Sequence, residues 1–335
     1  MCNGNKENII SNIEEKDKKA LLLGNGIFLS HPSKGDNFKF SFRELKDDLI
    51  KVYEEHYKCK DIDCPEELLS LFRVELSLEI LKYYKKKFDD NYFLDKELSE
   101  IKAFVKPFKN IYTINYDPVT YRFIFGEEGT YFNDGFNGSG EKSIEEIEKN
   151  LKNDKDIYYL HGAFHIIKEY ENDKYIKLKS SKNKLLMDVI KEKHEEIVKQ
   201  WREGSAEYKE NFSVVLAAEP HYKQITIERD PYLKFCKDQL SKENKVVSVG
   251  CSFKKDEHLL EAILLNPNLE SFEIGVYDEN DKKNVEDACE RIEKRLTEKD
   301  KHIFKCNCNK ERRKFVCTRD LDKLFWSNVP CPAKE

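Results

Sequence analysis

Short apolar stretches that end in glycine or a polar residue most constrain how this chain can fold. Three of them read LLLGNG (21–26), IYTINYD (111–117) and YYLHG (158–162). Further apolar stretches begin at Phe212, Asn244 and Ser271. A strand that is apolar throughout is typical of a parallel sheet covered on both faces, because a strand with one wet face alternates instead. The sequence therefore predicts an α/β fold in which helices cover a parallel sheet.

Helical patterns fill the intervals between these stretches. Residues 41–106 contain three helical segments, and Pro65 suits the first turn of the second one. Residues 168–210 carry Lys and Glu at i, i+4 spacing, which predicts an exposed helical insert. After the stretch that begins at Ser271, either Asn280 or Asp281 is expected to cap a further helix.

The two ends of the chain differ in composition from the middle. Residues 1–18 are a polar leader without periodicity, and residues 296–335 form a short segment that contains four cysteines. The main domain is therefore expected to span residues 19–295. The segment 302–319 is expected to form a β-hairpin.

The four C-terminal cysteines do not have the spacing of a zinc module. Structural zinc sites usually combine two close cysteine pairs, whereas here one C-x-C is followed by gaps of eight and thirteen residues. We therefore expect reduced thiols and no zinc at these positions. The residues are Cys306, Cys308, Cys317 and Cys331.

Composition excludes several classes of protein. The 335 residues are 39% hydrophobic and 37% charged, with a formal net charge of −5, so the chain lacks the basic field typical of nucleic-acid binding. No apolar run approaches the roughly 20 residues needed to cross a bilayer, and the N-terminus has no signal-peptide core. We expect a cytoplasmic protein with neither a nucleic-acid nor a membrane partner.

The polar ends of the predicted strands should meet. In open parallel sheets, ligands bind outside the carboxyl ends of the strands. The segments GNG (24–26), NYD (115–117), HG (161–162) and GCS (250–252) all follow predicted strands. One crevice could therefore collect all four.

The glycines of the first segment suit a phosphate-binding turn. Gly24 would allow a tight turn, and Gly26 would let the backbone approach a pyrophosphate. Leu29 stands where a third glycine of G-x-G-x-x-G would be. An ordinary strand-to-helix turn therefore remains an alternative.

The side chains of the other segments suit catalysis. Asn115 could position a ribose hydroxyl or a water, and Asp117 could hold an amide, although both could also be turn caps. His161 is a candidate proton acceptor because imidazole titrates nearest neutral pH. His165 is a less favoured alternative, and a structural histidine also remains open.

Taken in order, GNG, TINYD, LHG and VGCSFKKDEH resemble motifs of the sirtuin-like (SIR2-like) family. The stretches LLLGNG and SVGCSFKKDEHLLEAI look like the bacterial branch that includes the DUF4917 group. The resemblance covers most of residues 20–280. It implies a Rossmann-like, sirtuin-like sheet with large helical inserts at about 41–106 and 168–210.

The resemblance also implies a role for each candidate residue in an NAD site. Gly24, Asn25 and Gly26 match the pyrophosphate loop. Asn115 and Asp117 match the residues that hold the nicotinamide ribose and carboxamide, and His161 matches the catalytic histidine. Gly250 and Ser252 match the loop around the adenosine half, where Asp256 is a further candidate. No metal ligand is implied.

Two departures from the family bear on the activity. Residues 162–235 contain no cysteine, so the zinc module of protein-deacylating sirtuins is missing, and no peptide-docking segment is recognisable. The resemblance then implies an NAD+ hydrolase that releases nicotinamide and ADP-ribose, with NAD as its substrate, and a role in anti-phage defence. A NAD-dependent deacylase or ADP-ribosyltransferase, or a non-catalytic NAD-sensing module, remain alternatives.

Free NAD hydrolysis would be toxic to the host, so an off state is expected. A homo-oligomer, or a regulatory or phage-derived protein, could provide it. The segments 41–106 and 168–210 would be the contact surfaces.

Overall fold

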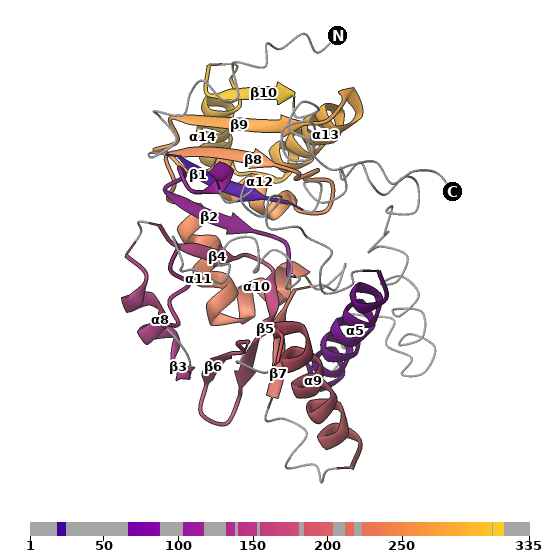
Figure 1. Ribbon diagram of the computed structural model, residues 1–335. Coiled ribbons are helices and arrows are strands. Elements are labelled where there is room, and N and C mark those ends of the chain that lie inside the picture. Colours follow the sequence, from indigo (N-terminus) through magenta and orange to yellow (C-terminus); the bar gives the residue numbers. More distant parts are fainter. Residues whose placement is uncertain are drawn as a thin grey trace, which may run out of the picture.

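A computed structural model describes ten segments of the chain (Figure 1). They are residues 19–24, 66–87, 103–116, 132–137, 140–152, 155–180, 184–203, 212–217, 223–309 and 311–317. The predicted site residues Asn25, Gly26 and Asp117 lie outside these segments, as do the leader 1–18, Pro65 and Cys331.

Six parallel strands form the larger sheet. They are β1 (Ala20–Leu23), β2 (Asn110–Thr113), β4 (Ile157–Tyr159), β8 (Lys245–Val249), β9 (Ser271–Val276) and β10 (Arg313–Cys317). Their order across the sheet is β10-β9-β8-β1-β2-β4. Numbered by position in the chain, this is 6-5-4-1-2-3, the doubly wound order of a Rossmann-type sheet. The predicted α/β, Rossmann-like fold is confirmed.

The central strands of this sheet are buried along their whole length. All four residues of β1 and of β2 are buried, which explains why their sequences are apolar rather than alternating. Four helices from the C-terminal half of the chain pack together beside the sheet, and α13 contacts β9 (Figure 1). They are α11 (Pro231–Leu240), α12 (Glu257–Leu264), α13 (Glu279–Arg295) and α14 (Glu298–Asn307).

A second, antiparallel sheet lies beyond β4 (Figure 1). Its order is β3 (Glu141–Lys142), β6 (Lys174–Lys177), β5 (Gly162–Glu169) and β7 (Phe212–Leu216). Helices α5 (Glu66–Lys87) and α9 (Leu186–Glu203) pack against it and share a separate apolar core with it. Two short helices, α8 (Ile144–Asn150) and α10 (Lys223–Arg229), complete the described elements.

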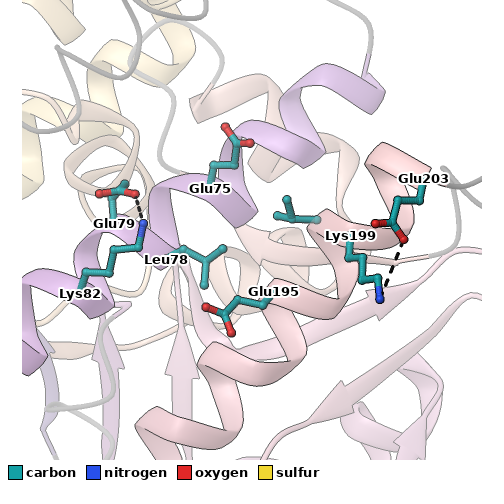
Figure 2. A pocket seen from close by; sticks show the side chains of 8 residues that line it. Glu75, Leu78, Glu79, Lys82, Glu195, Lys199 and Glu203 are labelled. Carbon is teal, nitrogen blue, oxygen red and sulfur yellow. Dashed lines mark hydrogen bonds and ion pairs between the residues drawn. The ribbon is translucent and has the colours of Figure 1, made fainter.

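Helices α5 and α9 lie side by side and border a charged groove of about 480 Å³ (Figure 2). Leu78 and Val198 contribute apolar surface to it. Its charged lining consists of Glu75, Glu79, Lys82, Glu195, Lys199 and Glu203. None of the helices that the structure describes is long and apolar enough to span a membrane.

Two predictions for the middle of the chain are wrong. Residues 168–177 are not helical, because β5 continues to Glu169 and turns into β6, where Tyr175 is fully buried. Among the described residues of this insert, only α9 is a helix. The strand that begins at Phe212 does exist, but it pairs antiparallel with β5 rather than joining the parallel sheet. Burial against tertiary neighbours outweighs the local Lys and Glu spacing here.

Two predictions near the C-terminus are also wrong. Asp278, rather than Asn280 or Asp281, caps α13, and its carboxylate accepts a hydrogen bond from the Asp281 N–H (2.9 Å). The segment 302–319 does not form a hairpin. Its first part continues α14, which Thr297 caps, and its second part is β10, a parallel edge strand beside β9.

Candidate functional site

The carboxyl ends of β1 and β8 meet at the point where the strand order of the larger sheet reverses. A crevice forms at such a switch point because the connections on its two sides leave in opposite directions. The Gly24 N–H donates to the Val249 carbonyl (2.8 Å). A Cβ atom on Gly24 would lie 2.2 Å from the Gly250 oxygen and 2.7 Å from Cys251 Sγ. Only glycine permits this approach of the two strand ends.

Asn115 extends the site to the end of β2. Its backbone N–H donates to Thr113 Oγ1 (3.0 Å), and its Nδ2 donates to the Gly24 carbonyl (3.3 Å). The side chain is buried, with Asn115 1% exposed, and Oδ1 has no hydrogen-bond partner among the residues that the structure describes. An unsatisfied buried acceptor costs about 1–3 kcal/mol. This oxygen could accept a hydrogen bond from a ligand.

His161 lies in the turn through which the chain passes from the larger to the smaller sheet. The Leu160 N–H donates to the Thr113 carbonyl (2.9 Å), and the Ala217 N–H donates to the His161 carbonyl (2.9 Å). Gly162 follows with φ +79°, and a Cβ atom there would lie 1.8 Å from the Val215 oxygen. The glycine of the HG pair thus permits the turn that holds His161.

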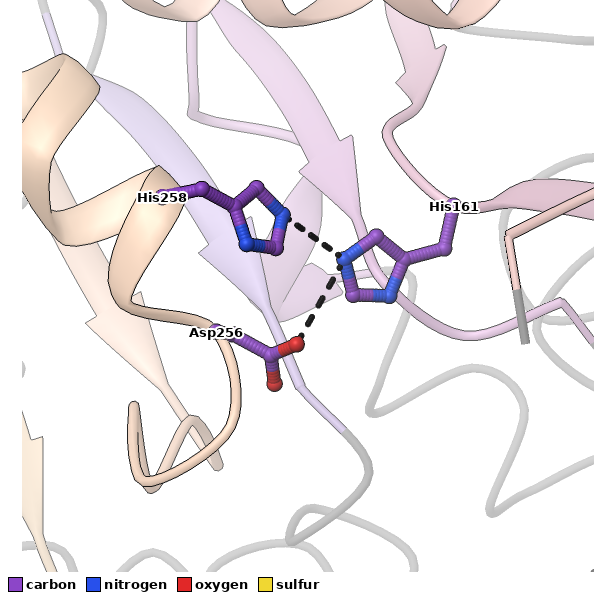
Figure 3. A group of neighbouring side chains, drawn as sticks. All are labelled: His161, Asp256 and His258. Carbon is purple, nitrogen blue, oxygen red and sulfur yellow. Dashed lines mark hydrogen bonds and ion pairs between the residues drawn. The ribbon is translucent and has the colours of Figure 1, made fainter. Parts of the chain in front are cut away.

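His161 faces two side chains from the start of α12 (Figure 3). Its Nε2 lies 3.6 Å from Asp256 Oδ1 and 3.4 Å from His258 Nε2. Both imidazoles are buried, with His161 2% and His258 8% exposed. Among the described residues, these three form the one group whose spacing could hold a metal ion.

Lys223, at the start of α10, completes the cluster. Its Nζ lies 2.6 Å from Asp256 Oδ1. Burial alone would raise the pKa of Asp256, but the charge of Lys223, followed by that of His161, holds it well below its usual range. Burial lowers the pKa of His258 to about 4. At neutral pH the cluster therefore contains a carboxylate, an ammonium group and a neutral His258.

Three further candidates lie between β8 and α12, and His165 lies in β5. Gly250 follows β8 with φ +73°, and Ser252 is exposed between it and Asp256. Asp256 was expected near the adenosine half of a nucleotide, and it lies beside His161. His165 is fully buried in β5, with the edge of its ring against Tyr159 (5.0 Å between centroids).

His258 and Lys223 were not predicted from the sequence. His258 stands two residues after Asp256 in KDEH, so the D-x-H spacing at a helix start was an available signal. Lys223 lies 33 residues before Asp256, and no local pattern connects the two.

The C-terminal cysteines lie away from this cluster where they are described. Cys306 is exposed, and Cys308 is half-buried. Arg313 donates to Cys289 Sγ (3.0 Å). The side chain of Cys317 lies outside the described part of the chain.

The strand order defines a doubly wound α/β protein, a class in which ligands bind outside the carboxyl edge of the sheet. The model of the family "Domain of unknown function (DUF4917)" matches residues 85–309, which is two thirds of the chain. The protein belongs to the DUF4917 family, as its motifs predicted.

Several solved structures of Sir2 proteins are distantly similar. Sir2Tm bound to a propionylated peptide is 13% identical, with a TM-score of 0.38, and the match covers 87% of this chain and 98% of that one. A Sir2 structure on mechanism and regulation is 12% identical, with a TM-score of 0.38 and coverage of 97% and 96%. A Sir2 complex with a p53 peptide and NAD+ is 13% identical, with a TM-score of 0.35 and coverage of 87% and 98%. No curated protein matches the sequence.

Likenesses at this level carry no functional argument. The fold class is assigned from the strand order, and membership of the DUF4917 family is assigned from the match to the family model.

Proposed function

We propose that the protein is an NAD+ hydrolase that cleaves the bond between nicotinamide and ribose with water. Dinucleotides bind across the switch point of doubly wound sheets, which here lies between β1 and β8. The observation that carries the proposal is the buried Asn115 Oδ1, which has no hydrogen-bond partner within the described part of the chain. A water or ribose hydroxyl would supply the missing hydrogen bond.

The pyrophosphate would lie against the backbone from Gly24 to Gly26. Gly24 lies close against the end of β8, where a Cβ atom would lie 2.2 Å from the Gly250 oxygen, and backbone N–H groups that follow it would bind the phosphates. Ser252 and Gly250 would lie by the adenosine half, and Asp117 would hold the carboxamide of nicotinamide.

The chemical step needs a nucleophile and a proton acceptor. As the C1′–N bond breaks, the ribose develops oxocarbenium character and water adds to C1′. Asn115 would orient the water, and His161 would accept its proton, directly or through a ribose hydroxyl. The products are nicotinamide, ADP-ribose and one proton. Asp256 would stabilise the resulting imidazolium, since its Oδ1 lies 3.6 Å from His161 Nε2.

Incubating the purified protein with NAD+ and separating the products tests this proposal. We expect nicotinamide and ADP-ribose without any added acceptor. A well-placed base contributes roughly 10²–10⁴ in rate, so His161→Ala should lower turnover by that factor, and Asn115→Ala should also abolish most of it. His302→Ala, at an exposed histidine of α14, is the matched control and should retain the parental rate.

Three outcomes would contradict the proposal. Turnover at the parental rate in His161→Ala or Asn115→Ala would remove these residues from the mechanism. Release of nicotinamide only after addition of an acylated peptide or acceptor protein would indicate a deacylase or ADP-ribosyltransferase. Thermal stabilisation by NAD+ with no product over hours would indicate a sensing module.

The resemblance to bacterial SIR2-like proteins supports a role in NAD depletion during phage infection, in the cytoplasm. The helices α5 and α9 come from the two segments expected to contact a partner, and they border one groove (Figure 2). A homo-oligomer or a phage-derived trigger would act there. Measuring the NADase rate across fractions of a sizing column tests assembly control, and equal rates in every fraction would argue against it.

A further inference from the structure

We infer that His161, Asp256 and His258 form a site for a zinc-class divalent cation, and that an ion bound there switches off NAD+ hydrolysis. The second half of this inference rests on the proposed function. The first half concerns the cluster alone and is tested separately.

The spacing of the donor atoms fits tetrahedral coordination. Zinc–nitrogen and zinc–oxygen bonds of about 2.0–2.1 Å place two tetrahedral ligand atoms about 3.3–3.4 Å apart. His161 Nε2 lies 3.4 Å from His258 Nε2 and 3.6 Å from Asp256 Oδ1. All three donor atoms lie within 4.8 Å of one another. An ion could therefore bind with small movements of side chains alone.

The chemistry of the donor set favours zinc over magnesium or calcium. Two imidazoles and one carboxylate suit Zn²⁺, whereas the harder ions prefer oxygen ligands. Three protein ligands leave a fourth position for water. The two imidazoles point toward each other from different parts of the fold, 97 residues apart in the chain (Figure 3).

Lys223 sets the affinity of this site. Its ammonium group is 2.6 Å from the same oxygen of Asp256 that would face the ion. The carboxylate must then share its charge between Lys223 and the metal, and the two cations repel each other. Removing the positive charge of Lys223 should therefore tighten metal binding.

A metal ion bound at this site would prevent His161 from acting as the proposed base. A metal bound to His161 Nε2 uses the electron pair with which that nitrogen would accept a proton. Asp256 would at the same time stop supporting the imidazolium. This provides an off state for an activity that would otherwise drain NAD from the host.

Metal binding is measured first, without reference to activity. Untagged protein is titrated with Co²⁺ and followed by the visible absorption of tetrahedral cobalt, and Zn²⁺ is then bound in equilibrium dialysis. His258→Gln should weaken binding at least about 100-fold, because even outer-shell changes cost 10–100-fold. Lys223→Met should tighten it roughly tenfold. His302→Gln should change nothing.

Activity is then assayed across the same Zn²⁺ concentrations. The parent and His302→Gln should lose activity as the site fills, and His258→Gln should stay active at zinc levels that inhibit the parent. Absence of metal binding in the parent, or equal binding in His258→Gln, would overturn the site. Activation by zinc, or inhibition unchanged in His258→Gln, would overturn the switch. If metal binds as expected but no preparation cleaves NAD+, the proposed function fails while the site stands.

Discussion

The two sheets differ in how they accommodate buried polar groups. In the antiparallel sheet, Lys177 of β6 pairs with Asp134, and the two side chains are 6% and 5% exposed. At the carboxyl edge of the parallel sheet, Asn115 Oδ1 has no hydrogen-bond partner among the ten described segments, and one oxygen of Asp256 pairs with Lys223 and also faces His161. In the Lys177–Asp134 pair, each charge is balanced by the other. At the parallel edge, Asn115 and Asp256 have polar atoms that could still bind a ligand.

This difference gives different expectations for variants in the two regions. A buried polar group that is matched by a neighbour stabilises one conformation, whereas an incompletely satisfied group costs free energy until a ligand arrives. Variants in the antiparallel region should therefore mainly lower stability. Variants at the parallel edge should mainly lower activity.

The largest effect on stability is expected at Gly162, which joins the two regions. Gly162→Ala should cost about 4 kcal/mol or more in the free energy of unfolding, because the new Cβ would lie 1.8 Å from the Val215 oxygen at φ +79°. Gly140→Ala is the control. It also has positive φ (+116°), but no atom of the described residues would lie within 4 Å of a Cβ there, so backbone strain of about 1–3 kcal/mol remains. If urea unfolding showed equal losses of unfolding free energy for Gly162→Ala and Gly140→Ala, the structure would have relieved the clash at Gly162.

Breaking an ion pair in each region compares the two directly. Lys177→Met should cost about 3–5 kcal/mol, because it leaves the buried Asp134 carboxylate without its cation. Lys223→Met should cost no more than about 2 kcal/mol, since the Asp256 side chain is 15% exposed and can reach water. Urea unfolding of both variants at neutral pH measures the difference. A larger loss for Lys223→Met would reverse the comparison.

The buried His194 of α9 should make stability depend on pH. Burial lowers its pKa from 6.5 to about 3, and its Nδ1 contacts Ser77 Oγ. As the pH falls below 6.5, the unfolded chain binds a proton that the folded chain does not. The free energy of unfolding should thus drop by roughly 3 kcal/mol between about pH 7 and about pH 4 through this group.

His194→Gln isolates that contribution. The variant should lose stability at pH 7 through repacking, but its stability should fall less steeply with acidification than that of the parent. His302→Gln, at an exposed histidine, should follow the parental pH profile. Parallel profiles for His194→Gln and the parent would show that His194 is protonated in the folded state.

The parallel sheet could be predicted from the sequence because the residues of its strands directly reflect their burial. Leu21 to Leu23 and Ile111 to Tyr112 are runs of consecutive apolar residues. Such runs are expected only in strands that are buried on both faces. The antiparallel sheet gave a weaker signal. In β6, buried Tyr175 and Lys177 alternate with half-buried neighbours, and the lysines also fit a helical charge pattern.

Residues of the candidate site could be predicted where a polar residue or glycine directly follows an apolar strand. Gly24, Asn115 and His161 each follow an apolar strand, so their position at the sheet edge followed from the strands. His258 and Lys223 reach the site from α12 and α10 through tertiary packing. Their partners lie 97 and 33 residues away in the chain, beyond the range of any local pattern.

The smallest effect on stability is expected at the residue on which the proposed function most depends. Asn115→Ala removes one long hydrogen bond (3.3 Å) together with an oxygen that has no partner in the described segments, so it should cost less than about 1 kcal/mol. Asn133→Ala should cost about 1–3 kcal/mol. The Asn133 side chain donates to the Asn150 carbonyl (2.7 Å) and accepts from the Gly135 N–H (3.0 Å), and both bonds would be lost.

Stability and turnover together decide what Asn115 does. A structural amide would lose free energy of unfolding when removed and leave the rate per folded molecule unchanged, as we expect for Asn133→Ala. Removal of an amide that binds a ligand would have the opposite effects. The unfolding curve would be unchanged, and little NAD+ would be cleaved. A loss of 2 kcal/mol or more in Asn115→Ala, with turnover preserved, would place it with the matched polar groups of the antiparallel region.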